Sequence, residues 1–321
     1  MSIECLRTAD ERFQNLPDFD FQPRYLDGAG RFVGMRQHYL DEGPADAEVT
    51  FLWLHGEPTW AYLYRKMIPV FTAAGHRVVV PDFFGFGRSD KPVDDSVYTF
   101  DFHRESLLSF VQQLSLSNVC LVCQDWGGLL GLTMPMEFSQ SEFSRLLVMN
   151  TGIGTGKSPG KGFDDWKAFA AANPDLPVGQ LLQRSHRGMT DAEAAAYDAP
   201  FPDVRYKGGV RRFPQLVPVS PDMEGVELGK RAANWWRNEW QERALWPLVC
   251  RIRFWARHKC VLCSKLFVIA LSQWKSQKLV ISFRSAVQKS RKRRWHTSIL
   301  PFASYGYLSR KTEHLHLCGR E

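Results

Sequence analysis

The segment around Asp125 constrains the fold of this chain more than any other part of the sequence. The apolar run 119–123 is followed by Gln124, Asp125, Trp126 and the pair Gly127-Gly128. This order predicts a buried strand, a sharp turn and a helix. A carboxylate at the apex of such a turn is well placed to act as a nucleophile, because the helix N-terminus behind it favours negative charge. The alternative is a loop Asp that caps the next helix.

The first half of the chain alternates between strand-like and helix-like segments. We expect strands at 49–54, 77–81 and 146–149, besides the one before Asp125, and helices at 62–74 and 102–114. Such alternation predicts an α/β fold, a mostly parallel sheet with helices on both faces. Ligands bind beyond the carboxyl ends of parallel strands. His55-Gly56-Glu57, Asp82 and Asp125 all follow predicted strands, so we expect the functional site there.

The composition divides the chain into four parts. Residues 1–150 are the first part of the α/β core, and 151–228 are rich in Gly, Pro and Ala, with short helical segments such as Asp191 to Tyr197. We interpret 151–228 as a helical cap inserted over the sheet and 229–241 as the return to the core. Residues 242–321 form a basic tail of different composition, so the C-terminal part of the core is expected to be missing or disrupted.

Several motifs resemble those of the haloalkane dehalogenases, a family of the α/β-hydrolase superfamily. They are His55-Gly56-Glu57-Pro58-Thr59-Trp60, Gly85-Phe86-Gly87-Arg88-Ser89-Asp90-Lys91-Pro92 and Gln124-Asp125-Trp126-Gly127-Gly128, followed by Phe163-Asp164-Asp165-Trp166, Ala199-Pro200-Phe201-Pro202-Asp203 and Asn238-Glu239-Trp240. The resemblance covers residues 1–241, about three quarters of the chain. The most specific part of the pattern is an Asp nucleophile combined with Glu57 and Trp166.

The resemblance implies hydrolytic dehalogenation of small haloalkanes, with water as co-substrate and no metal or organic cofactor. Asp125 would be the nucleophile, forming an alkyl ester and releasing halide. Indole N–H groups of Trp126 and Trp166 would hold the halide, although both side chains could also be ordinary packing residues. Backbone N–H groups of Glu57 and Trp126 would form an oxyanion hole. Phe163 would line the substrate pocket, or simply pack within the cap.

The tail departs from the family pattern. Residues 242–321 contain 17 Lys+Arg against 3 Asp+Glu, a net charge of +14, and no Asp. The family mechanism needs a histidine base with an acidic partner, and both lie beyond residue 241 in family members. The tail histidines His258, His296, His314 and His316 are not in that context. The general base and its acid are therefore absent from this chain, which we expect to be inactive or limited to alkylation.

A change of reading frame explains the tail. In the shifted frame, each codon consists of the third base of one codon and the first two bases of the next. Such codons can encode family-like residues from Ala244 to Arg257 and from Trp274 to Ser285. The genetic code forces some of them, such as Ala from Trp246/Pro247. The codon for the missing His would span the junction between the codons of Val280 and Ile281. We interpret 242–321 as a frameshifted translation.

Two alternatives remain open. An epoxide hydrolase would use a similar Asp elbow but needs a pair of cap tyrosines, and Tyr197 and Tyr206 form no recognisable pattern. A non-catalytic protein could instead bind nucleic acid through the basic tail, including 291–294, although basic runs arise without selection in a shifted frame. We expect no nucleic-acid or membrane partner. A cytoplasmic location is expected, because neither a secretory signal nor an 18-residue apolar segment is present. We also expect a monomer.

Overall fold

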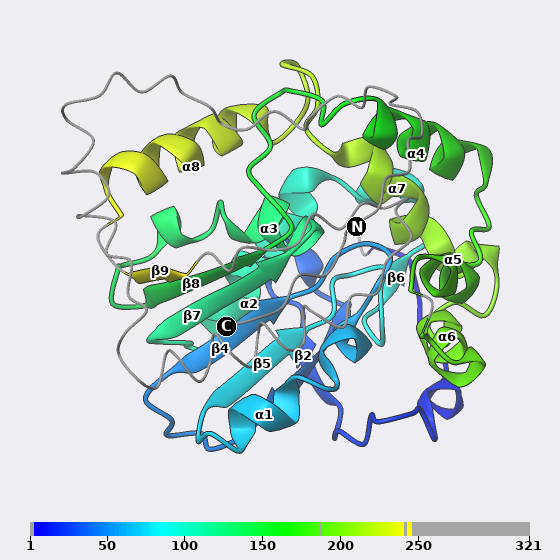
Figure 1. Cartoon of the computed structure of the whole chain (residues 1–321), viewed down its shortest axis with the longest axis horizontal. Helices are drawn as coiled ribbons and strands as arrows, with labels where there is room; N and C mark the ends of the chain where they lie inside the picture. The colour runs from blue at the N-terminus through cyan, green and yellow to red at the C-terminus, as the bar shows by residue number, and fades with distance from the viewer. Residues whose placement is uncertain (1–2, 187, 241–242, 246–321) are drawn as a thin grey trace, which may run out of the picture.

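The predicted strand before Asp125 lies near the middle of a seven-stranded sheet of order β2-β3-β5-β4-β7-β8-β9 (Figure 1). The computed structural model describes residues 3–186, 188–240 and 243–245. The strands of this sheet are β2 (Arg24–Asp27), β3 (Arg36–Glu42), β4 (Thr50–Leu54), β5 (Arg77–Pro81), β7 (Val119–Gln124), β8 (Phe143–Met149) and β9 (Arg243–Leu245). A separate two-stranded sheet pairs β1 (Cys5–Leu6) with β6 (Lys91–Pro92).

The large sheet is parallel from β5 to β9 and antiparallel at β2 and β3. Every residue of β4 is buried, as is β7 up to Cys123. Parallel strands covered on both faces read as continuous apolar runs, which explains the sequence of both strands. The chain runs from β4 to β5 and then crosses to β7 on the other side of β4, so the strand order reverses between β4 and β7. Ligand sites form at such a reversal.

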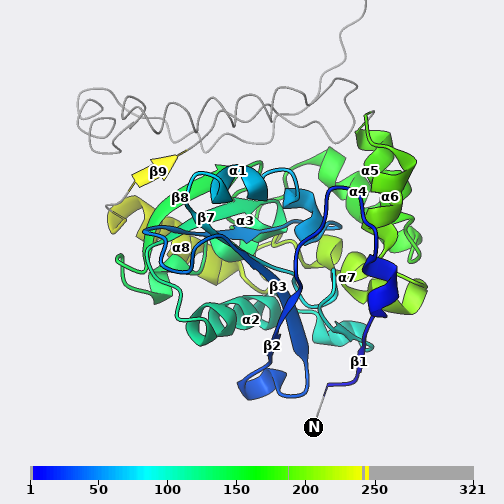
Figure 2. The same cartoon turned by 90° about the horizontal axis from the view of Figure 1, so that it is seen from below.

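Helices cover the sheet on both faces, with α1 on one side and α2 on the other (Figure 2). The α-helices are α1 (Ile68–Thr72), α2 (Phe100–Gln113), α3 (Trp126–Gly131), α4 (Lys161–Ala172), α5 (Val178–Ser185), α6 (Asp191–Asp198), α7 (Gly208–Leu216) and α8 (Val226–Asn238). The 3₁₀ helices are η1 (Asp10–Phe13), η2 (Gly30–Phe32), η3 (Ala61–Tyr64), η4 (Asp95–Val97), η5 (Pro135–Glu137) and η6 (Val204–Lys207).

The predicted elements of the core are confirmed with one exception. The strand before Asp125, the three other predicted strands and the helix at 102–114 all appear, with shifts of three residues or fewer at their ends. The single helix expected at 62–74 is wrong. The structure has η3 and then α1, whose first turn contains Pro69. Proline lacks a backbone N–H and fits only the first turn of a helix, so the α-helix begins there.

The segment expected to form a cap contributes helices α4 to α7 and, among its described residues, no strand. In Figure 1 these helices lie together beyond the ends to which the arrows of β4 and β7 point. Helix α8 crosses the expected boundary at residue 228. The division into core and cap stays a prediction. The expected disruption of the C-terminal core falls mostly on 246–321, outside the described residues.

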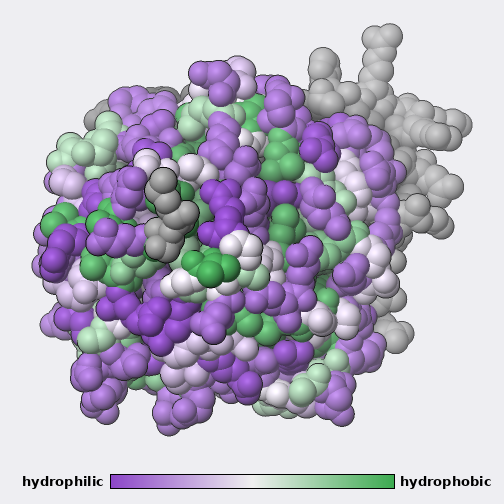
Figure 3. All heavy atoms as spheres, turned by 180° about the vertical axis from the view of Figure 1, so that it is seen from behind, coloured by the Kyte–Doolittle hydropathy of each residue, from purple (hydrophilic) through white to green (hydrophobic). Residues whose placement is uncertain are grey.

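The surface seen in Figure 3 is largely hydrophilic, with hydrophobic side chains in small, separated groups. In the part of the chain that the structure describes, no helix combines the length and hydropathy required to cross a membrane.

Candidate active site

Asp125 occupies the turn between β7 and α3 with φ +51° and ψ −121°. A non-glycine residue in this region is strained, and such strain is common where a turn presents a reactive side chain. The turn is possible because glycines follow it. A Cβ on Gly127 would lie 2.1 Å from the carbonyl oxygen of Leu54, and one on Gly128 would lie 2.0 Å from Thr151 Cγ2. The predicted elbow therefore exists, and its two glycines allow β4 and Thr151 to approach closely.

A hydrogen bond connects the elbow to the neighbouring strand end. The backbone N–H of Glu57 donates to Asp125 Oδ1 over 2.9 Å. Glu57 follows β4 and Asp125 follows β7, so this bond spans the point where the strand order reverses. Gly56 is required beside it, because a Cβ there would lie 2.4 Å from Asp125 Cβ. The structure thus brings the predicted nucleophile and one predicted oxyanion-hole donor together.

Two carboxyl groups share this buried site. Burial raises the pKa of Asp125, and the backbone N–H groups of Glu57 and Trp126 oppose that rise. Burial and the nearby Asp125 carboxylate raise the pKa of Glu57 well above its usual value, and Glu57 Oε1 lacks a hydrogen-bond partner among the described residues. The Asp125 carboxylate disfavours ionisation of Glu57, so the two groups titrate as a coupled pair.

Trp126 begins α3 and is 2% exposed. Its ring lies 4.4 Å from that of Phe213, between centroids, and 6.2 Å from that of Phe100. Phe213 belongs to α7, so a helix of the expected cap packs directly against the elbow. The Trp126 side chain therefore has a mainly apolar environment, in which an N–H donor is more effective than in water.

Trp166 and Phe163 lie three residues apart on α4, and both are half-buried. Trp166 packs against the core cluster, and its ring centroid lies 6.0 Å from that of Phe169. Gln215 of α7 donates to the carbonyl oxygen of Lys167 over 3.0 Å, which fixes α4 against the helix that carries Phe213. Halide binding by Trp166 and substrate contact by Phe163 stay predictions. Tyr197, one of the cap tyrosines considered above, packs against Tyr62.

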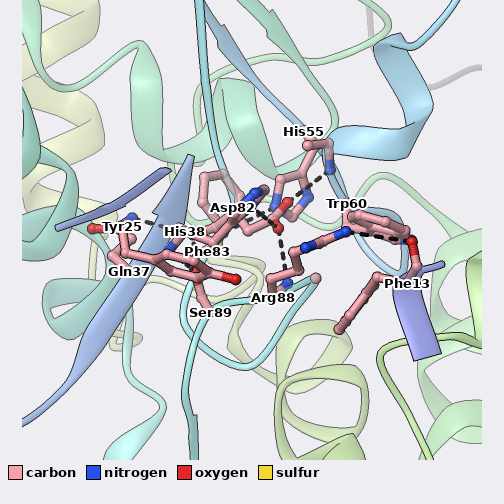
Figure 4. A network of polar contacts seen from close by, with 12 residues as sticks. Phe13, Tyr25, Gln37, His38, His55, Trp60, Asp82, Phe83, Arg88 and Ser89 are labelled. Carbon is pink, nitrogen blue, oxygen red and sulfur yellow. Dashed lines mark hydrogen bonds and ion pairs between the residues drawn. The ribbon is translucent and has the colours of Figure 1, made fainter. Parts of the chain in front are cut away.

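A buried hydrogen bond between His38 and Asp82 lies behind the site, and no local sequence pattern predicts it (Figure 4). Asp82, which follows β5, accepts 2.7 Å hydrogen bonds from His38 Nδ1 and from the backbone N–H of Ala61. It also accepts from the N–H of Arg88. Burial raises the pKa of Asp82, but His38, His55 and the Ala61 N–H outweigh it, so the net pKa is lowered. The carboxylate thereby holds the loop before η3, which contains Glu57, against the loop after β5.

The buried histidines are not placed to activate water. His55 has hydrogen bonds at both ring nitrogens, to Gly56 and to Phe83. His38 is fully buried and its Nδ1 is bound to Asp82. His103 is packed among rings including Phe213, and burial lowers its pKa to about 3. Within 3–186, 188–240 and 243–245, no group of three or more His, Cys, Asp or Glu side chains could hold a metal ion.

Comparison with known proteins agrees with this geometry. A model of the alpha/beta hydrolase fold matches residues 49–281. Over 247 residues the chain is 47% identical to a haloalkane dehalogenase from Psychrobacter cryohalolentis, which covers 76% of this chain and 78% of that protein. Over 234 residues it is 46% identical to one from Mycobacterium marinum, covering 72% and 78%.

Among solved structures, the haloalkane dehalogenase DpaA from Paraglaciecola agarilytica is similar, with 53% identity and a TM-score of 0.74 over 76% of this chain and 82% of that one. That structure is described as tetrameric. The monomer expected for this chain stays a prediction.

The fold and the elbow define this chain as an α/β-hydrolase, a hydrolase enzyme by class. The sequence identity to the haloalkane dehalogenases extends over more than two thirds of their length, which narrows the assignment to one family of that class. The chain belongs to the haloalkane dehalogenase family.

Proposed function

We propose that Asp125 displaces halide from small haloalkanes and forms an alkyl ester. A carboxylate oxygen attacks the sp³ carbon, a C–O bond forms, and the carbon–halogen bond breaks with its electron pair leaving on the halide. The observation that supports this most is the strained, partly buried position of Asp125 with its Oδ1 held by the Glu57 N–H. A carboxylate needs no deprotonation step before attack, and the two backbone donors help to keep it ionised.

The halide leaves into an apolar region of the site. We assign Trp126 and Trp166 as its donors, because an indole combines one N–H with an apolar body. Phe163 lies on the same helix as Trp166 and serves as an apolar wall for the alkyl chain. The carboxyl group of Glu57, whose pKa is raised by burial and by Asp125, orients a water molecule there. The backbone N–H groups of Glu57 and Trp126 stabilise the oxyanion that forms when the ester is attacked.

We further propose that this chain stops at the ester. Ester hydrolysis needs a base that activates water. The two ring nitrogens of His55 are engaged, and His38 and His103 are fully buried. The family-like base and acid are encoded in the shifted frame of 242–321, with the His at Val280/Ile281. The nucleotide sequence tests this directly: a junction that does not spell a His codon in that frame excludes the frameshift.

The half-reaction is tested by exposing the full chain to 1-bromobutane. We expect one butyl group on Asp125 by peptide mass spectrometry and release of one bromide per chain. Asp125→Asn, which keeps the shape of the side chain, should release none. Folded, unmodified protein would contradict the nucleophile, and sustained release of many bromide ions per chain would contradict arrest at the ester.

A further inference from the structure

The His55 side chain has a defined tautomer. Its Nε2 lies 3.0 Å from the backbone nitrogen of Phe83, and its Nδ1 lies 3.0 Å from the carbonyl oxygen of Gly56. A backbone N–H can only donate, so Nε2 is the acceptor and the ring proton is on Nδ1. Full burial lowers the pKa of His55, so the ring remains neutral and keeps this tautomer. His55 therefore donates from Nδ1 to Gly56.

The Gly56 carbonyl and the Glu57 N–H belong to one peptide group. The carbonyl oxygen accepts from His55 Nδ1, from Thr59 Oγ1 over 2.7 Å and from the Thr59 N–H over 2.9 Å. The N–H of the same peptide group donates to Asp125 Oδ1. Hydrogen bonds in series polarise one another, because donors at a carbonyl oxygen draw electron density from the amide nitrogen. A more polarised amide is a stronger donor.

We propose that His55 is a positioning residue that strengthens the Glu57 N–H···Asp125 hydrogen bond by polarising the peptide group between Gly56 and Glu57. The hydrogen bond is present whatever reaction Asp125 performs. Only the effect of His55 on alkylation rests on the proposed function.

The surroundings hold the imidazole in this position. Its ring is stacked on that of Phe83, with 4.1 Å between centroids, and lies edge-on to Phe86 at 5.6 Å. The titratable groups that act on it are Asp82, whose pKa is lowered, and His103, whose pKa is about 3. Asp82 stays ionised and His103 stays neutral near neutral pH.

Three substitutions separate the polarising contact from simple packing. His55→Asn places an amide N–H where Nδ1 was and preserves the donor to Gly56. His55→Gln reaches the Nε2 position and preserves the acceptor for Phe83, but loses the donor. His55→Phe preserves only the ring. If the role of His55 were only packing or the contact with Phe83, His55→Gln or His55→Phe would preserve the Glu57 hydrogen bond and alkylation better than His55→Asn.

The direct measurement is the amide proton shift of Glu57 by NMR in the full chain. We expect an upfield shift in His55→Phe and His55→Gln and a shift near that of the unsubstituted chain in His55→Asn. If Phe does not fold, the comparison of Gln with Asn decides. Equal Glu57 shifts in Gln and Asn, or a larger displacement in Asn, overturn the proposal.

The second measurement is the pH at which alkylation by 1-bromobutane reaches half its plateau, which reports the titration of the coupled Asp125 and Glu57 carboxyl groups. A weaker Glu57 donor should raise this pH by about 0.5 unit in His55→Gln, roughly threefold in proton affinity, and much less in His55→Asn. An identical half-plateau pH in the two variants counts against the proposal. If the unsubstituted chain is not alkylated, the proposed nucleophile fails, while the amide shift still decides the role of His55.

Discussion

Thr151 donates a 2.6 Å hydrogen bond from Oγ1 to the backbone carbonyl oxygen of Asp125. Thr151 follows β8, so a neighbouring strand end supports the turn from outside. The same side chain fills the space beside Gly128, where any Cβ would lie 2.0 Å from its methyl carbon. The strained backbone of Asp125 is thus held by contacts on two sides, from Glu57 at the carboxylate and from Thr151 at the carbonyl.

Replacing Thr151 tests this support. Thr151→Val keeps the shape but removes the donor, and we expect it to lower the free energy of unfolding by about 1 kcal/mol. Alkylation of Asp125 should slow as well, because the turn is less firmly held. Thr151→Ser keeps the hydroxyl group and should alkylate at nearly the original rate. Urea denaturation and bromide release measure both effects, and equal rates in Val and Ser would show that the hydroxyl group has no role.

The close approach of β4 to α3 makes a second prediction. Gly127→Ala would place Cβ 2.1 Å from the Leu54 carbonyl oxygen, which is backbone of a buried strand and cannot move cheaply. We expect a loss of about 3 kcal/mol or more in unfolding free energy. Gly162→Ala on α4 is the matched control, since nothing lies within 4 Å of its Cβ position. It should leave stability unchanged or raise it by about 0.5 kcal/mol. Equal destabilisation by the two would contradict the packing argument.

The elbow could be predicted from sequence because its determinants are local. An apolar strand, an acidic residue and two glycines within ten positions leave few alternatives, and the structure has the strand, turn and helix at those residues. The parallel order followed from the alternation of segments. The single helix expected at 62–74 failed because periodicity alone does not show where a chain turns before Pro69.

The contacts around the site could not be predicted, because they join residues far apart in the sequence. His38 lies 44 positions from Asp82 in the sequence. The hydrogen bond from the Ala61 N–H to Asp82 depends on how two loops meet. His55 was noted only as a strand-end residue. Its hydrogen bond from the Phe83 N–H depends on the loop after β5, which no local pattern describes. Strand order, which places Glu57 beside Asp125, is likewise a property of the whole sheet.

A buried ion pair connects the loop after β4 to helix α6 and predicts an acid-sensitive stability. Arg65 Nη2 donates to Glu193 Oε1 over 2.5 Å, and Lys66 donates to the same oxygen over 2.8 Å. Hydrogen bonds from Lys66 and from the Thr190 N–H, against the opposing effect of burial, lower the pKa of Glu193 to about 2. A carboxyl group with a lowered folded-state pKa stabilises fully above its usual pKa of 4.5 and loses that contribution as the pH falls towards 2.

Glu193→Gln should therefore lower the unfolding free energy by about 3 kcal/mol at pH 7, since Arg65 is left buried without a charged partner. The difference from the unsubstituted chain should shrink between pH 4.5 and pH 2. Glu227→Gln removes an exposed partner of Lys230 and should change stability by less than about 0.5 kcal/mol. Urea titrations at several pH values measure both variants. If the stability difference between Glu193→Gln and the unsubstituted chain does not change with pH, the charge of Glu193 does not explain it.

Lys91 predicts a pH dependence of the same sign, but in an alkaline window. Its side chain is fully buried, and Nζ donates to the carbonyl oxygens of Gly87 and Ser89 over 2.8 and 2.9 Å. Burial lowers the pKa of Lys91 from 10.5 to about 7, although Asp82 and Asp90 oppose the change. Between these two values the unfolded chain binds more protons than the folded chain. The contribution of Lys91 to stability therefore rises with pH across this window, by up to about 1.4 kcal/mol per pH unit.

Comparison of the chain with Lys91→Met isolates this contribution, because every other titrating group is common to both proteins. The unfolding free energy of the chain relative to Lys91→Met should increase from pH 7 to pH 10 and remain level below pH 7, where Lys91 is protonated in both states. Lys230→Met, on the exposed face of α8, should show no such increase. Urea denaturation at half-unit pH steps supplies the curves. Parallel curves for the chain and Lys91→Met would mean that Lys91 keeps its proton, in which case its carbonyl acceptors and the two carboxylates outweigh the cost of burial.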